Sequence, residues 1–383
     1  MDADYLRDVA DLCLRLLHVV AGIAWIGASF YFIRLDLGLR PPEREADAAR
    51  GVAGEYWGVH GGGFYHSQKY LAAPPKLPEP LHWFKWEAYT TWLSGFALLV
   101  LLYWLDAGDR LVDPAVADLE PWQAAALSAA GLALAWVVYD VACRVLRDDR
   151  FVAVAVAALV VLSAYAADEL FAARASFLQV GAMLGTIMAA NVFVVIIPAH
   201  WELVRAKQEG RDPDPEVGLR AKQRSVHNNY LTLPVVFTML AGHFPLTFGQ
   251  EHAWLVLLAL FAILVAIRHF FNLWHTGRRA WWILGAAGVG AVALAIVLAP
   301  DDVDATAVPT DAAAQSIVAE RCASCHSGTA APLGVRLENI EQMRQHAGSI
   351  EAMVASRAMP PGNATGLTDT ERAQLVAWAA AAG

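Results

Sequence analysis

Five residues near the C-terminus, Cys322-Ala323-Ser324-Cys325-His326, have the pattern C-x-x-C-H. Two thiols at this spacing on a helical turn can reach both vinyl groups of one porphyrin, and the adjacent imidazole can ligate its iron. Met359 suits the second axial position, because a thioether ligand raises the reduction potential. A zinc site would need a second ligand pair, and a redox C-x-x-C pair would need a βαβ context; neither accompanies the motif. The motif therefore predicts one covalent c-type haem bound through Cys322 and Cys325, with His326 and Met359 as the metal ligands.

The composition excludes an ordinary soluble protein. Of the 383 residues, 57% are hydrophobic and 17% are charged, and the mean hydropathy is +0.41. The formal net charge is −9, and no nucleic-acid partner is expected. Cys13 and Cys143 lie in apolar runs, so we expect them to pack as small apolar residues rather than to form a disulfide.

Eight apolar stretches are long enough to cross a bilayer whose hydrocarbon core is about 30 Å thick. They cover residues 12–33, 88–105, 122–143, 151–167, 176–199, 230–246, 253–274 and 280–299. The chain is therefore predicted to be all-α, a polytopic membrane bundle of about eight transmembrane helices followed by a small class I-like cytochrome c domain. We expect a membrane domain over 1–299, a short acidic tether over 300–309 and a haem domain over 310–383. The covalent haem would supply much of the core of so small a domain.

The basic residues of the connections predict the orientation. Eighteen Lys and Arg lie in the connections after the first, third, fifth and seventh stretches, against three in the alternate set. Such an excess marks the cytoplasmic side. Both termini are then periplasmic in a bacterial inner (plasma) membrane protein with several spans, and c-type haem is attached on that same side. The two large cytoplasmic loops, 34–87 and 200–230, are rich in aromatic and hydrogen-bonding residues, so we expect ordered loops that build a site.

Histidines in or at the ends of the apolar stretches raise the question of a second haem. Ionisable residues inside a membrane are usually functional, and His18, His243 and His269 are candidate ligands of a b-type haem. Electrons released at the cytoplasmic loops would have to cross about 30 Å of hydrocarbon, which is too far for one efficient tunnelling step. The alternative is that these histidines form interhelical hydrogen bonds or bind lipid head groups. Nicotinamide, flavin and nucleoside triphosphate have no sequence support, because the Gly-rich motifs that bind them are missing.

The whole chain resembles the bacterial membrane-bound urate hydroxylase family, also called cytochrome c urate oxidases. The resemblance rests on the C-terminal haem motif and on five membrane-domain segments: 25–31, 61–65, 82–92, 222–230 and 268–272. It implies oxidation of urate to 5-hydroxyisourate, with water as the oxygen source and electrons passed to the haem. The next acceptor would be a soluble cytochrome or a terminal oxidase of the respiratory chain.

The inner loops offer the groups that such a reaction needs, which are a cation for the urate anion, hydrogen-bonding amides, an aromatic face and a base. The candidates are Lys69 or Lys85 for charge, Asn228 and Asn229 for the purine edges, Trp86 or Tyr230 for stacking, and His227 or Glu87 as base. The alternative for each is an anchor at the membrane interface, where Trp and Tyr are common.

The residues alone leave two other classes of function open. The main alternative is a membrane electron-transfer protein that oxidises quinol, which would favour a lipid-facing pocket and would not need two elaborate loops. A transporter or copper-handling protein with a fused cytochrome is less well supported, because no Met-rich or Cys-rich metal path is present. Urate-dependent reduction of the c-type haem separates urate oxidation from both.

Overall fold

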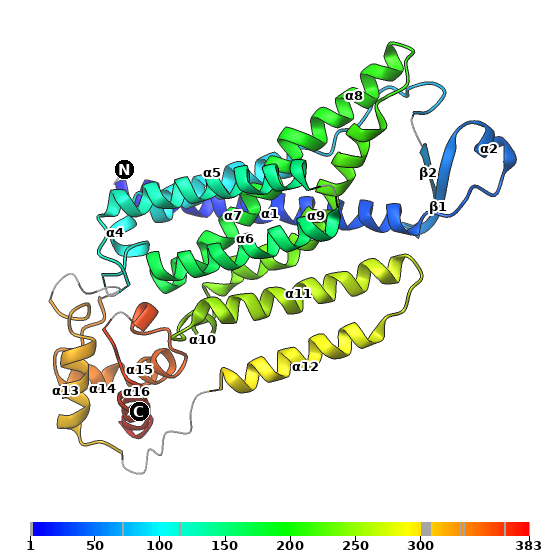
Figure 1. The fold of residues 1–383 in the computed structure, drawn as a ribbon. Coiled ribbons are helices and arrows are strands. Elements are labelled where there is room, and N and C mark those ends of the chain that lie inside the picture. Colours follow the sequence, from blue (N-terminus) through cyan, green and yellow to red (C-terminus); the bar gives the residue numbers. More distant parts are fainter. Residues whose placement is uncertain are drawn as a thin grey trace.

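A computed structural model describes residues 3–70, 73–114, 116–146, 148–299, 308–328, 331, 334–363 and 365–382. Long helices run side by side in an elongated bundle, and a separate group of shorter helices lies at one end of it (Figure 1). Most of the predicted tether, residues 300–307, lies outside the described residues.

In the described part of the chain, eight long helical segments form the bundle, and each overlaps one of the eight predicted stretches. They are α1 (Ala3–Gly38), α3 (Trp86–Leu99) with the π-helix η1 (Val100–Trp104), α5 (Pro121–Val145), α6 (Asp149–Leu170), α7 (Ala173–Ala190) with η2 (Asn191–Ile196) and α8 (Ile197–Gln208), α9 (Pro215–Ala241), α11 (Ala253–His275) and α12 (Trp281–Val297). Among the described residues, five helical segments are long and apolar enough to span a membrane, and α12 is a shorter apolar helix. The predicted helical membrane bundle is confirmed.

Helix α7 is the centre of the bundle. In the apolar window of α7 through α8, 56% of the residues are buried, against 11% in the window of α1. The main core cluster joins α7 to α5, α6, α9 and α11 through Phe177, Leu184 and Ile187 of α7 and residues such as Tyr139 and Leu257. A helix that is apolar on all sides belongs inside a bundle, whereas α1 exposes apolar side chains such as Leu12, as a lipid-facing helix does.

One end of the bundle carries a β-hairpin, and we call it the hairpin end. Strands β1 (Val52–His60) and β2 (Gly63–Tyr70) pair antiparallel, next to the short helix α2 (Glu45–Ala49). Gly61 and Gly62 form the turn with φ of 56° and 79°, values that favour glycine and that suit a two-residue hairpin. The sequence indicated an ordered loop here but not the hairpin.

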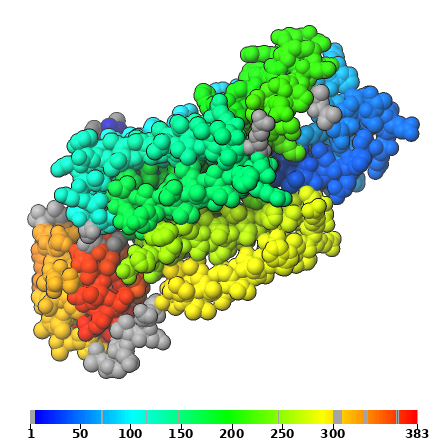
Figure 2. Space-filling view, viewed as in Figure 1, coloured from blue at the N-terminus to red at the C-terminus, as the bar shows by residue number. Residues whose placement is uncertain are grey.

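The opposite end, which we call the cytochrome end, carries the short helices α4 (Ala107–Arg110) and α10 (Pro245–Phe248), and the C-terminal helices lie beside it (Figures 1 and 2). The C-terminal helices are α13 (Asp311–Arg321), α14 (Ile340–Gln345), α15 (Ala347–Ala355), the 3-10 turn η4 (Pro361–Asn363) and α16 (Asp369–Ala382). Val318, Met343, Leu375 and Trp378 form their shared core. The Trp378 indole N–H donates to Asp311 at 2.9 Å, which joins α16 to the start of α13.

Candidate functional site

The C-x-x-C-H motif begins where α13 ends. Cys322 caps the helix and is half-buried, Cys325 is exposed, and both are free thiols. His326 Nδ1 lies 3.0 Å from the Val335 carbonyl oxygen. Because a carbonyl only accepts hydrogen bonds, Nδ1 carries the proton and Nε2 keeps its lone pair for a metal. Two free thiols and an imidazole of this tautomer fit a c-type haem.

The methionine loop after α15 is held by a buried arginine that the sequence analysis missed. Arg372 of α16 is 7% exposed, and its Nη1 donates to the Val354 and Met359 carbonyl oxygens at 2.7 and 2.9 Å. The Met359 N–H donates to Met353 O at 3.0 Å. The main chain on both sides of Met359 is thus fixed, as an axial ligand requires, and iron ligation by Met359 stays a prediction.

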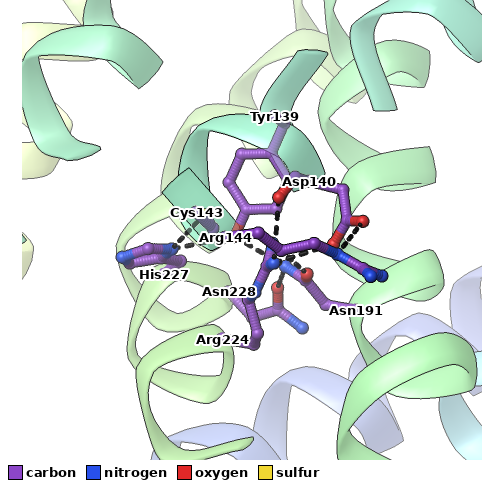
Figure 3. A network of polar contacts seen from close by, with 8 residues as sticks. All are labelled: Tyr139, Asp140, Cys143, Arg144, Asn191, Arg224, His227 and Asn228. Atoms are coloured by element: carbon purple, nitrogen blue, oxygen red, sulfur yellow. Dashed lines mark hydrogen bonds and ion pairs between the residues drawn. The ribbon is translucent and has the colours of Figure 1, made fainter. Parts of the chain in front are cut away.

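A network of polar side chains, which we call the Tyr139 network, joins α5, η2 and α9 (Figure 3). The Tyr139 hydroxyl lies 2.8 Å from His227 Nδ1 and accepts a hydrogen bond from Asn191 Nδ2 at 3.0 Å. Asn191 Nδ2 also donates to Asn228 Oδ1 at 2.9 Å. Asn191 is the first residue of η2, and π-helical turns within α-helices are frequent at functional sites. Residues in this network include two predicted site residues, His227 and Asn228.

An ion pair completes the Tyr139 network. Arg224 Nη2 lies 2.8 Å from Asp140 Oδ1, with side-chain exposures of 4% and 13%, and Arg144 pairs with the same carboxylate at 2.6 Å. The Arg224 guanidinium also lies over the Tyr139 ring, 4.9 Å from its centroid. Beside the pair is a groove of about 460 Å³ whose lining includes Cys143, Arg144, Arg220 and Arg224.

A second buried group, which we call the Asn229 cluster, lies between α9 and α11. Asn229 Oδ1 accepts hydrogen bonds from Arg268 Nε and Asn272 Nδ2, both at 2.9 Å. The Arg268 guanidinium carbon lies 3.9 Å from the centroid of the Phe30 ring of α1. Asn229 is a site residue predicted from the sequence, whereas Arg268 and Asn272 enter the sequence argument only as members of a family segment. Their i, i+4 spacing on an apolar helix was the available signal, because it puts both on one face.

The predicted substrate residues therefore do not form one cluster. His227 and Asn228 face α5 and η2, whereas Asn229 faces α11 and the Tyr230 hydroxyl lies 2.7 Å from His269 Nδ1 of α11. Consecutive residues of an α-helix are about 100° apart around its axis. Four consecutive polar residues of α9 thus contact two different sides of the bundle.

The remaining predicted residues lie near the hairpin end. Lys69 of β2 pairs with Asp36 of α1, and Lys222 of α9 pairs with the same carboxylate at 2.8 Å. Lys85 lies over the rings of Trp83 and Trp86, at 5.9 and 5.4 Å from their centroids. Glu87, at the start of α3, buries one carboxylate oxygen that has no hydrogen-bond partner among the described residues.

The hairpin itself has a buried carboxylate that the sequence analysis missed. Glu55 is 5% exposed, accepts from the Glu43 N–H at 3.0 Å and lies 2.8 Å from His66 Nε2. The Glu43 N–H is the main cause that lowers the pKa of Glu55. Trp57 stacks on His66 with ring centroids 4.1 Å apart. These contacts make the predicted loop an ordered element.

The three candidate ligands of a membrane haem are spread along the bundle. His18 Nδ1 lies 2.9 Å from the Thr91 carbonyl oxygen, and its ring packs so closely on α3 that a Cβ at Gly95 would be 2.7 Å from it. His269 lies toward the hairpin end, and His243 is exposed past the other end of α9. Among the described residues, no contact joins any two of the three histidines. Only His18 has a fixed Nδ1–H, which leaves its Nε2 available for iron.

Together, a helical membrane bundle and a C-terminal C-x-x-C-H domain define a membrane oxidoreductase with a c-type haem domain. A family described as urate oxidase N-terminal matches residues 4–299, and one described as cytochrome C oxidase, cbb3-type, subunit III matches residues 309–378. The chain belongs to the urate oxidase N-terminal family, and the family expected from its sequence is confirmed. No curated protein and no solved structure matches the chain.

Proposed function

We propose that this protein oxidises urate to 5-hydroxyisourate, takes the added oxygen from water, and passes the electrons to a haem bound covalently through Cys322 and Cys325. The observation that carries the proposal is the union, in one chain, of a urate oxidase N-terminal domain with a cytochrome c domain. The urate monoanion loses two electrons and one proton and becomes electrophilic at C5. Water then adds there, so urate anion and water give 5-hydroxyisourate, one proton and two electrons.

The reaction is placed at the hairpin end, which we assign to the cytoplasmic side, with both termini and the cytochrome domain in the periplasm of a bacterial plasma membrane protein. The clustering of buried polar groups toward that end supports this placement. Most residue roles proposed from the sequence are kept, with Glu87 or His227 as base, Asn229 for a purine edge, and Lys69 or Lys85 to attract the anion toward the site. Asn228 faces the other side of α9 from Asn229 and both of its amide groups are already bonded, so it is not assigned to the same purine. Glu87 is the stronger base candidate, because its buried Oε2 has no hydrogen-bond partner in the part of the chain that the structure describes, whereas His227 is hydrogen-bonded to Tyr139.

A path for electrons must run along the bundle. From Arg268 to the start of α11 at Ala253 is about 22 Å, from fifteen residues at 1.5 Å each. A b-type haem with His18 as a ligand would divide this path, and the free Nε2 of His18 supports that assignment. A soluble cytochrome or a terminal oxidase is the proposed next acceptor, with the lipid bilayer around the bundle.

Anaerobic titration of the oxidised, detergent-purified protein with urate tests the proposal. Urate should reduce the c-type haem, with half a urate consumed per protein if this is the sole acceptor. One urate per protein and a second, red-shifted α-band would mean a b-type haem as well, and absence of that band would remove His18 as its ligand. If urate leaves the spectrum unchanged and a quinol reduces the haem, the protein is instead a quinol-oxidising electron carrier.

A further inference from the structure

We infer that the Asn229 cluster is the site that binds the urate anion, with Arg268, Asn229 and Asn272 as its recognition groups. This inference rests on the proposed function. It starts from three buried atoms without a hydrogen-bond partner among the described residues: Asn229 Nδ2, Arg268 Nη2 and Asn272 Oδ1. Their residues are 0%, 5% and 8% exposed. Buried polar groups are rarely left unpaired in native proteins, so three in one cluster point to a ligand.

The charge of the cluster points to an anion. Arg268 and Arg224 are both buried arginines of the bundle, at 5% and 3% exposure. Arg224 has the Asp140 carboxylate at 2.8 Å, whereas no carboxylate in the described part of the chain lies within ion-pair distance of Arg268. The Phe30 ring faces the guanidinium but carries no net charge. An unpaired buried charge is strongly unfavourable, and a bound anion would supply the counter-charge.

The mixture of donors and acceptors points to a purine rather than a simple inorganic anion. Arg268 Nη2 and Asn229 Nδ2 are donors, and Asn272 Oδ1 is an acceptor. Chloride or sulfate could satisfy the two donors but not the acceptor, because neither anion carries a hydrogen at neutral pH. Urate presents a carbonyl, an N–H and a second carbonyl in sequence along its pyrimidine edge, which is the complement of two donors and one acceptor. It also carries the negative charge that Arg268 requires.

The surroundings fit the same assignment. Glu87 of α3 is the other residue of the described membrane domain with a buried, unpaired side-chain oxygen. Helices α3, α9 and α11, which carry all four unpaired atoms, each contact α1. A substrate held by the Asn229 cluster would thus lie among the helices that also position the proposed base.

Asn272→Leu tests the inference, because leucine has a similar size and removes the acceptor. We expect the KM for urate, measured by haem reduction, to rise about 10- to 100-fold, the range for an unpaired hydrogen-bonding group in a recognition site. Gln179→Met is the matched control. Gln179 is a buried amide of α7 whose two groups bond to Ser128, and its replacement should leave the KM within about threefold.

Two further measurements keep the inference testable. One does not depend on the folding of a variant, and the other does not depend on oxidation of urate. Wild-type protein should discriminate between urate and urate methylated at the pyrimidine-edge nitrogen, and Asn272→Leu should lose most of that discrimination. Calorimetric titration with urate should show the affinity loss independently of turnover. If both Asn272→Leu and Arg268→Lys keep the wild-type KM and affinity, the inference is overturned and water occupies the cluster. The proposed function would still stand. Urate binding that needs the cluster, without haem reduction, would refute the function and support the site.

Discussion

Breaking the buried ion pair between Arg224 and Asp140 by removing one partner should strongly destabilise the membrane domain. Asp140→Asn keeps the shape of the side chain and removes its charge, which leaves a 4% exposed guanidinium without a buried counter-ion. Removing one partner of a buried pair costs about 3–5 kcal/mol, and we expect the lower figure because the asparagine oxygen still accepts. At about 2 °C per kcal/mol for a large domain, the Tm should fall by about 6 °C.

Arg144→Gln is the matched control. Arg144 pairs with the same carboxylate but is 63% exposed, and exposed pairs contribute about 0–1 kcal/mol. Its loss should therefore lower the Tm by at most about 2 °C. The two substitutions each remove one charge from the same ion-pair network, so the difference between their Tm values measures the effect of burying the charged group.

Cys143 provides the assay. It is half-buried on α5, with its sulfur 4.0 Å from His227 Nδ1. In a Cys13→Ser background it is the sole cysteine outside the haem motif, so a thiol-reactive fluorophore reports unfolding of this region on heating in detergent. Equal Tm values for Asp140→Asn and Arg144→Gln would refute the reasoning. Adding Arg224→Met to Asp140→Asn should recover stability, because the uncompensated charge is then gone.

Three other outcomes are expected. Gly181→Ala should destabilise the bundle by about 1–3 kcal/mol, because its Cβ would lie 2.0 Å from Thr238 Oγ1, whereas Gly185→Ala, one turn along α7 with open space, should be neutral or stabilising in the same thermal assay. Met359→Ala should lower the reduction potential of the c-type haem in a redox titration, since a thioether ligand raises it, and an unchanged potential would exclude Met359 as a ligand. The cytochrome domain should lose stability as the pH falls below about 4.5, the ordinary pKa of a Glu side chain. The hydrogen bond from the Thr368 N–H, followed by the Thr368 hydroxyl and Arg321, lowers the pKa of Glu371. The stability that Glu371 contributes is therefore full above about pH 4.5 and is lost as its carboxylate is protonated. Acid unfolding of Glu371→Gln, followed by the haem spectrum, should lack that part of the pH dependence.

The helices and the haem motif could be predicted because each signal is local. A stretch of apolar residues reports its own tendency to enter a membrane, and C-x-x-C-H places two haem-attaching cysteines and one iron-ligating histidine within five consecutive residues. The β-hairpin was missed although Gly61-Gly62 is a hairpin turn signal, because the loop around it was assigned by composition alone. Arg372 was missed because its role depends on the Met359 loop, thirteen residues away in sequence.

The division of the polar residues of α9 between two sides of the bundle could not have been predicted from its sequence. His227 through Tyr230 read as one polar segment, and their partners are decided by how α9 is rotated against α5, η2 and α11. Hydropathy carries no information about that rotation in a helix that is polar on several sides. The π-helical turn at η2 adds to the difficulty, because it turns the side chains that follow Asn191 away from the face that an α-helix would give them.

The two buried arginines show what this division means for function. Arg224 and Arg268 look equivalent in the sequence, since each sits in a family segment with an asparagine four residues on, Asn228 or Asn272. The bundle gives Arg224 an internal carboxylate and gives Arg268 only an amide oxygen and an aromatic ring. An arginine that is neutralised within the protein needs no external counter-ion, whereas one that lacks an internal counter-ion favours whichever anion reaches it. One face of α9 is therefore suited to hold the helices together, and the other to bind a negatively charged substrate.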